Sequence, residues 1–142
     1  MATSIDTIRD DFSLLDEWED RYRYVIELGE ALPPFPEAER IAANKVPGCV
    51  SQVWLTTEQG PGVDPFISFK GDSDAHIVRG LVAIMLALFS GRPASEIQRT
   101  DAEETLKTLG LDEHLSPQRA NGLRSMVKRI KRDAEAALKQ TA

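Results

Sequence analysis

Apolar residues recur at helical spacing in the first part of the chain. This spacing predicts two helices, over residues 5–15 and 16–28, the first capped by Ser4 and the second ended by Gly29. Three prolines then fall within residues 30–44, and proline removes a backbone donor and fixes φ. We therefore expect that stretch to be an irregular loop.

The middle of the chain predicts a small antiparallel sheet. Residues 50–57 and 63–69 are rich in strand-forming residues, and the Gln-Gly-Pro-Gly run at 59–62 is a strong turn signal between them. A hairpin is the simplest arrangement of two such segments. A short third strand is expected near Gly71 and Ser73.

Residues 75–90 are apolar around nearly the whole circumference of the helix that they predict. A helix of that kind is buried, so we expect it at the centre of the protein. Asp74 is expected to cap this helix, and Gly91-Arg92-Pro93 to end it.

The C-terminal part predicts three more helices: 94–98, 102–109 with Asp101 as its cap, and a long helix that begins at Pro117 after the cap residue Ser116. Helices, a hairpin-based sheet and further helices in this order are typical of an α+β fold with several helices on one face of the sheet. The length fits a single domain over residues 1–142. No glycine-rich nucleotide-binding motif occurs.

Net charge and the length of the longest apolar run argue against nucleic-acid and membrane partners. The chain is 142 residues long with a formal net charge of −6, which argues against a nucleic-acid partner. Its longest apolar run, 81–89, is far shorter than the roughly 20 residues that cross a bilayer, and no basic-then-apolar leader is present. One free cysteine and no leader together predict a cytoplasmic protein without membrane contact.

The charges are distributed unevenly. Residues 1–40 contain eleven acidic and four basic residues, a balance of −7, whereas residues 116–142 contain seven basic and two acidic residues, a balance of +5. One interpretation is a polarised molecule that is steered toward a protein partner. The other is two solvated helix faces that pair with each other.

Cys49 is the only cysteine, so any sulfur chemistry needs a second molecule. It follows Pro47-Gly48 at the junction of a turn and a strand, where a thiol can be presented to a macromolecule. The thiolate is the reactive form, and exposed turn amides or a nearby arginine would stabilise it. The alternative is that Cys49 is a small buried apolar residue.

Other candidate residues leave two rival functions open. His76 paired with Cys49 would give a thiol hydrolase or transferase, while His114 lies in an acidic loop. If Cys49 is inert, the chain is a non-catalytic interaction module. One cysteine and two histidines without short ligand spacing do not predict a metal site. Asp72 and Asp74 flank a turn, where capping explains at least one of them.

Several blocks of the sequence closely resemble the SufE family of sulfur-acceptor proteins, which includes the CsdE paralogues. The first block is Val46-Pro47-Gly48-Cys49-Val50-Ser51-Gln52-Val53-Trp54. The others are Tyr24-Val25-Ile26-Glu27-Leu28-Gly29, Gly71-Asp72-Ser73-Asp74-Ala75 with Ile77-Val78-Arg79-Gly80-Leu81, and Leu115-Ser116-Pro117-Gln118-Arg119 with Gly122, Leu123 and Met126. The resemblance covers residues 5–135.

This resemblance implies a fold shared with IscU-type scaffolds and a role as a sulfur carrier in iron–sulfur cluster assembly. It implies that Cys49, in the family's Gly-Cys-x-Ser motif with Gly48 and Ser51, accepts sulfur from the persulfide of a SufS- or CsdA-like cysteine desulfurase and stimulates that enzyme. Pyridoxal phosphate then belongs to the desulfurase and the chain itself needs no cofactor. The sulfur passes to a SufBCD-type scaffold, and Asp74 and Arg119 are expected contacts of the partner.

Sulfur transfer of this kind requires residues 45–51 to reach into the desulfurase. A turn that moves outward suits that task, and a sheltered resting position would limit oxidation of the thiol.

Overall fold

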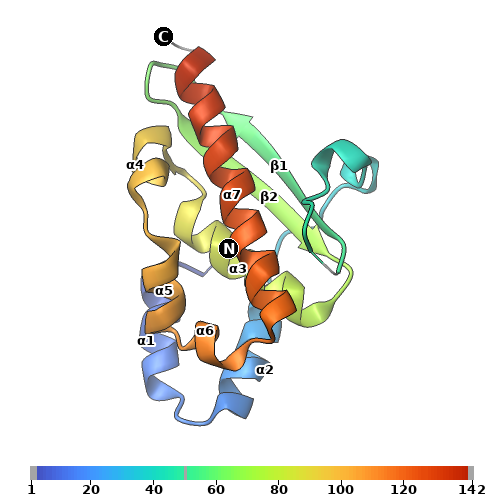
Figure 1. Cartoon of the computed structure of the whole chain (residues 1–142), viewed down its shortest axis with the longest axis vertical. Coiled ribbons are helices and arrows are strands. Elements are labelled where there is room, and N and C mark those ends of the chain that lie inside the picture. Colours follow the sequence, from blue (N-terminus) through green and yellow to red (C-terminus); the bar gives the residue numbers. More distant parts are fainter. Residues whose placement is uncertain (1–2, 50, 141–142) are drawn as a thin grey trace.

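The computed structural model describes residues 3–49 and 51–140, and these residues form an α+β fold (Figure 1). In chain order the elements are α1 (Ile5–Leu14), α2 (Trp18–Glu30), the short 3₁₀ turns η1 (Glu37–Glu39) and η2 (Ala42–Asn44), β1 (Val53–Gln59), β2 (Phe66–Ser73), α3 (His76–Phe89), β3 (Arg92–Pro93), α4 (Ala94–Arg99), α5 (Ala102–Thr108), α6 (Leu111–His114) and α7 (Pro117–Gln140). The predicted fold class, a small antiparallel sheet packed against several helices, is confirmed.

The three strands lie in the order β1-β2-β3, and every neighbouring pair is antiparallel. α3 packs on β2 and α7 packs on α3, so both helices cover the same face of the sheet (Figure 1). The opposite face exposes Phe66 and Lys70 on β2. At the other end of that face Trp54 and its cross-strand partner Asp72 are buried, and the side chain of Arg40 covers them.

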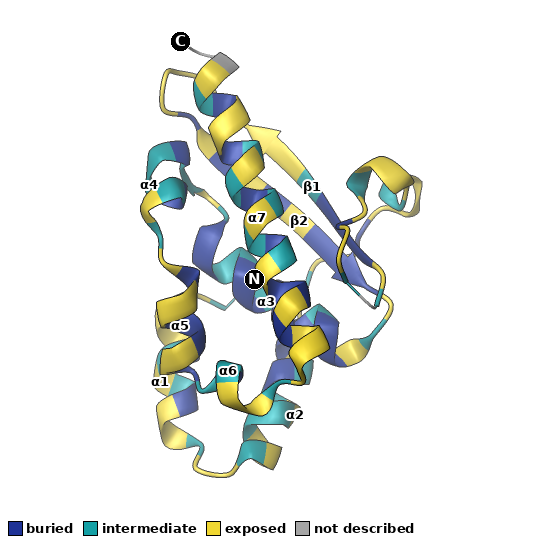
Figure 2. Ribbon diagram, viewed as in Figure 1, coloured by how far each residue is buried: buried dark blue, intermediate teal, exposed yellow. Residues whose placement is uncertain are grey.

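The central position predicted for α3 is confirmed, since this helix is buried on most sides (Figure 2). Its buried residues are Ile77, Val78, Gly80, Leu81, Val82, Ile84, Met85, Leu88 and Phe89. The prediction that Asp74 caps α3 is wrong: Ala75 occupies the N-cap position. The Asp74 carboxylate accepts a hydrogen bond from the backbone N–H of Gln52 instead, at 3.0 Å.

The predicted end of α2 at Gly29 is also wrong, because α2 continues to Glu30 and Gly29 is buried inside it. Gly29 lies where α2 crosses α3, and a Cβ atom there would come within 2.7 Å of the backbone nitrogen of Gly80. Gly80 is equally constrained, since its Cβ would lie 2.6 Å from the carbonyl carbon of Val25. Glycine serves close helix packing here and not helix termination.

The strands differ from their predicted bounds. β1 begins at Val53, three residues later than expected, and the predicted first strand residue Val50 lies outside the described residues. β2 begins later, at Phe66, and continues through Ser73, so the third strand expected near Gly71 and Ser73 is wrong. The third strand is β3, which occupies the predicted helix stop because Gly91 N–H donates to the Ile67 carbonyl at 2.8 Å.

The C-terminal helices follow the predictions closely. The Asp101 carboxylate accepts from the backbone N–H of Glu104 and caps α5, and the Ser116 hydroxyl accepts from the backbone N–H of Arg119 at the start of α7. The short helix α6 was not predicted. The apolar stripe of α7 faces the core: Leu123, Met126, Ile130, Ala134 and Ala137 are buried, and Val127 and Leu138 are half-buried.

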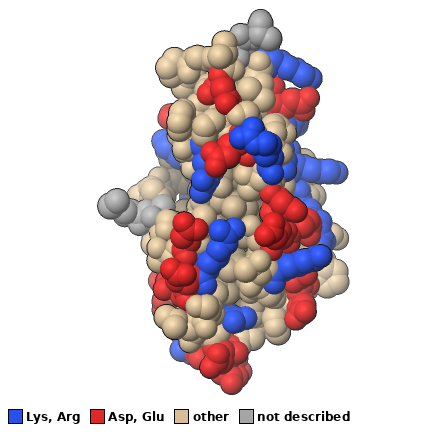
Figure 3. Space-filling model, turned by 90° about the vertical axis from the view of Figure 1, so that its left-hand side faces the viewer, with Lys and Arg blue, Asp and Glu red and all other residues tan. Residues whose placement is uncertain are grey.

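The surface carries both signs of charge. Figure 3, which views the side formed by α1, α4 and α5, shows acidic and basic side chains interspersed. The ion pairs that α7 makes with described residues join it to Glu103 on α5 or lie within α7 itself. None of these pairs joins residues 1–40 to residues 116–142. None of the helices in the described part of the chain is long and apolar enough to span a membrane.

Candidate functional site

Cys49 lies in a loop whose two ends are held together. We call residues 45–52 the Cys49 loop; Val50 within it lies outside the described residues. At its base Lys45 forms a β-bridge with Trp54, and Val46 N–H donates to the Val53 carbonyl at 2.8 Å. The loop therefore projects from the start of β1 as a turn with a closed base.

The tip of this loop rests on α7. The Cys49 thiol donates a weak hydrogen bond to the Gly122 carbonyl, with an S–O distance of 3.6 Å, and the side chain is half-buried. Gly48 has φ of +88°, which favours glycine, and a Cβ atom there would lie 2.5 Å from the Ser125 hydroxyl oxygen. Only small residues on both surfaces allow the tip to sit this close to the helix.

A pocket of about 360 Å³ opens beside the thiol. Its lining consists of Cys49, Ser51, Val78, Leu81, Ser116, Gln118, Arg119, Gly122 and Met126. The apolar part comes from α3 and α7, and the polar part from the loop and the first turn of α7. The structure thus brings together three of the predicted site residues, Cys49, Ser51 and Arg119.

The resting environment disfavours the thiolate. Burial raises the pKa of the Cys49 thiol above its ordinary value. The sequence-based expectation that the turn amides or an arginine stabilise an anionic sulfur is therefore not met in this position of the loop. At neutral pH the resting side chain is a protonated thiol, which is a poor nucleophile.

The comparisons with known proteins agree on one family. The family model for SufE, described as "Fe-S metabolism associated domain", matches residues 6–134. The chain belongs to the SufE family. An uncharacterized SufE-like protein of Rhizobium meliloti is 64% identical over 137 residues, 96% of this chain and 98% of the relative. One of Rhizobium etli is 63% identical over 133 residues, 93% of this chain and 90% of the relative.

Two other predicted residues of this SufE-family chain, one in the loop and one next to it, do not line the pocket. Gly48 forms the loop tip. Asp74 accepts from both the backbone and the side-chain nitrogens of Gln52, at 3.0 and 3.4 Å, and so holds the C-terminal end of the loop. Both residues are exposed.

Neither histidine belongs to the pocket that Cys49 lines. His114 stacks on Trp18, with ring centroids 4.3 Å apart, and His76 is exposed at the start of α3. Within residues 3–49 and 51–140 no group of three or more histidine, cysteine and carboxylate side chains is arranged to hold a metal ion.

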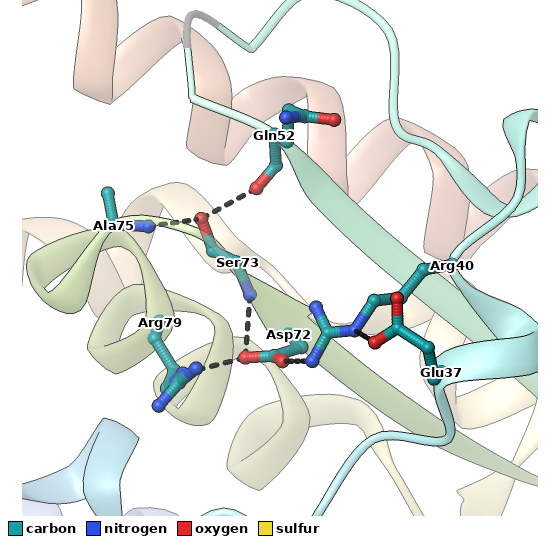
Figure 4. A network of polar contacts seen from close by, with 7 residues as sticks. All are labelled: Glu37, Arg40, Gln52, Asp72, Ser73, Ala75 and Arg79. Carbon is teal, nitrogen blue, oxygen red and sulfur yellow. Dashed lines mark hydrogen bonds and ion pairs between the residues drawn. The ribbon is translucent and has the colours of Figure 1, made fainter.

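The main feature that sequence reasoning missed is a buried ion-pair cluster next to the loop (Figure 4). The Asp72 carboxylate, whose side chain is 8% exposed, pairs with both Arg40 and Arg79. In the sequence Asp72 appears as one of two acids at a turn and as part of a block that resembles the SufE family, and neither marks it as the centre of an ion-pair cluster. Nothing in the sequence indicates that Arg40, 32 residues earlier, reaches the same carboxylate.

Proposed function

We propose that this protein is a sulfur carrier of iron–sulfur metabolism in which Cys49 accepts a sulfane sulfur from the persulfide of a cysteine desulfurase. One observation carries the proposal: the only thiol of a SufE-family chain lies at the tip of a loop, and among the described residues its one hydrogen bond to α7 is the weak bond from Cys49 to the Gly122 carbonyl. Losing a bond of that kind costs little free energy.

The transfer step is a thiol exchange with balanced bonds. The Cys49 thiolate attacks the outer sulfur of the partner's persulfide, a new S–S bond forms at Cys49, and the partner's S–S bond breaks. The partner's cysteine leaves as a thiolate, and Cys49 now holds the persulfide. No external oxidant or reductant takes part. Pyridoxal phosphate, when bound in the partner desulfurase, releases the sulfur from L-cysteine.

The raised pKa of Cys49 gives this step a built-in control. In the resting loop the thiol is protonated and half-buried, which limits both premature reaction and oxidation. Once the loop leaves α7, the burial that raises the pKa is removed and the thiolate fraction increases. Docking on the desulfurase would thus expose and activate the thiol in one movement.

The other predicted residues have supporting roles in this proposal. Gly48 permits the close approach of the loop to α7, Ser51 and Arg119 line the pocket that faces the thiol, and Asp74 holds the end of the loop. We propose that all four contact the desulfurase when the loop is extended. The same exchange then passes the sulfur to a thiol of a SufBCD-type scaffold.

The test is transfer of radiolabelled sulfur from L-cysteine through a desulfurase, followed by non-reducing electrophoresis. The wild-type chain should acquire label that a reductant removes, and Cys49→Ser should acquire none. His76→Gln should accept label as the wild type does, because the described pocket contains no imidazole. Undiminished labelling of Cys49→Ser would rule out the proposed acceptor, and loss of labelling in His76→Gln would favour the Cys–His enzyme.

A further inference from the structure

The Asp72 carboxylate is buried and has three hydrogen-bond donors (Figure 4). Arg79 Nε donates to Oδ1 at 2.6 Å, the backbone N–H of Ser73 donates to the same oxygen at 2.8 Å, and Arg40 pairs with Oδ2. Burial alone would raise the pKa of Asp72, but the Ser73 N–H and the two guanidinium groups together hold it below its usual value. The carboxylate is therefore charged at neutral pH.

One arm of this cluster reaches the C-terminal end of the Cys49 loop. Ser73, fixed by its backbone bond to Asp72, donates its hydroxyl proton to the Gln52 carbonyl at 2.7 Å (Figure 4). The same hydroxyl oxygen accepts from the backbone N–H of Ala75 at the start of α3. Gln52 is thus joined to the cluster three residues after Cys49.

The other arm reaches the N-terminal end of the loop. Arg40 belongs to the segment that leads into Lys45, and it pairs with Asp72 and, at 3.0 Å, with Glu37. Its guanidinium carbon lies 5.0 Å from the centre of the Trp54 ring, and Trp54 is the bridge partner of Lys45. The chain therefore enters the loop from a segment that is anchored to the same carboxylate.

General stability does not by itself account for this cluster. Apolar residues of similar size often stabilise a protein as well as a buried ion pair does, or better. What distinguishes this cluster is where its partners lie. Arg40 and Ser73 are on the two segments that precede and follow the Cys49 loop, and Arg79 joins both to α3.

We propose that Asp72 is a positioning residue that holds both ends of the Cys49 loop, so that only the tip of the loop leaves α7 when Cys49 reacts. This inference rests on the proposed function, because it assigns the cluster a part in presenting the reactive thiol. It also limits the movement: Gly48 and Cys49 at the tip move, while Val46 and Gln52 stay at the base of the loop.

The experiment measures the rate at which iodoacetamide alkylates Cys49 in the folded, full-length protein. Ser73→Ala removes the hydroxyl that joins the cluster to Gln52, and Arg40→Gln removes the charge that anchors the entering segment. Loss of one net hydrogen bond should raise the alkylation rate by about two- to ten-fold, because the loop opens more often.

Ser90→Ala is the matched control. Its hydroxyl accepts from the backbone N–H of Phe69 at 2.9 Å, so it too joins a helix to β2, but nearer the opposite end of that strand from Ser73. A merely structural role predicts lower thermal stability for all three variants and no specific change in alkylation. Under the proposal, Ser73→Ala and Arg40→Gln react faster than the wild type and Ser90→Ala does not.

Two results would overturn the inference: wild-type alkylation rates in both Ser73→Ala and Arg40→Gln, or an equal rise in Ser90→Ala. If Ser73→Ala fails to fold, Arg40→Gln decides the matter, because its side chain is partly exposed. Alkylation needs no desulfurase, so failure here leaves the proposed sulfur transfer standing. Conversely, absence of sulfur transfer would not change the alkylation rates.

Discussion

Gly48 and Ser125 touch where the Cys49 loop meets α7, and a Cβ atom on Gly48 would lie only 2.5 Å from the Ser125 hydroxyl oxygen. A larger side chain at either position would clash with the other residue. Together with the bond from Cys49 to the Gly122 carbonyl, one turn earlier on the helix, it defines the resting place of the thiol. The position of Cys49 thus depends on two small residues of α7, Gly122 and Ser125.

Ser125→Leu should displace the loop and make Cys49 more reactive. Overpacking costs about 1–3 kcal/mol, which the protein can relieve by releasing the loop. Each 1.4 kcal/mol corresponds to a factor of ten in the fraction of open loop, so the alkylation rate of Cys49 should rise by a factor between about five and somewhat over one hundred. Ser13→Leu, an equal change on the exposed surface of α1, should leave the rate unchanged. A wild-type rate for Ser125→Leu would show that α7 does not hold the loop.

The pH dependence of alkylation should show that the pKa of the Cys49 thiol is raised in the folded protein. Because burial raises the pKa of Cys49, the rate in the folded protein should reach half its maximum at a pH above the ordinary value of about 8.5. In concentrated urea the midpoint should return to about 8.5. Measured rates from pH 6 to pH 10.5 test this, and a folded-state midpoint below 8 would contradict the described environment.

Asp72 should make the stability of the fold depend on acid pH. Its pKa is lower in the folded protein than in the unfolded chain, so its contribution is complete above the unfolded value of about 3.9 and is lost as the pH falls through the folded value. Chemical denaturation between pH 2 and pH 6 measures this. In Asp72→Asn the free energy of unfolding should be lower at pH 6 and should fall less on acidification. If the free energy of unfolding of Asp72→Asn fell on acidification as much as that of the wild type, the buried ion pair would be contradicted.

Gly80→Ala should destabilise the protein although alanine is the better helix former. The added Cβ would lie 2.6 Å from the carbonyl carbon of Val25 and would force α2 and α3 apart. We expect a loss of at least about 2 kcal/mol in urea denaturation, as for other overpacked sites. Ala87→Gly on the same helix should cost only about 1 kcal/mol, the difference in helix propensity. A Gly80→Ala protein as stable as the wild type would contradict the close crossing.

Local patterns predicted α1, α3 and α7 because their apolar spacing lies within the segments themselves, and for α1 and α7 the cap residue directly precedes the helix. Features that depend on distant residues were not predictable. Gly29 has the sequence signature of a helix end, yet it serves the contact with Gly80, 51 positions later. β3 is two residues long and exists only because β2 pairs with it.

The same limit applies to the site. Cys49 stands out as the only thiol in a turn before a strand, so the sequence was sufficient to find it. Its burial depends on Gly122, 73 residues further along the chain. The cluster around Asp72 was hidden for the same reason, since its two arginines lie on separate segments.

The most direct test of the proposed role is mass spectrometry of the intact protein and its peptides after incubation with a cysteine desulfurase and L-cysteine. The account predicts that the mass of one or more sulfur atoms is added to the peptide that contains Cys49, and that a thiol reductant removes it. A desulfurase that turns over L-cysteine while the Cys49 peptide keeps its original mass would contradict the account.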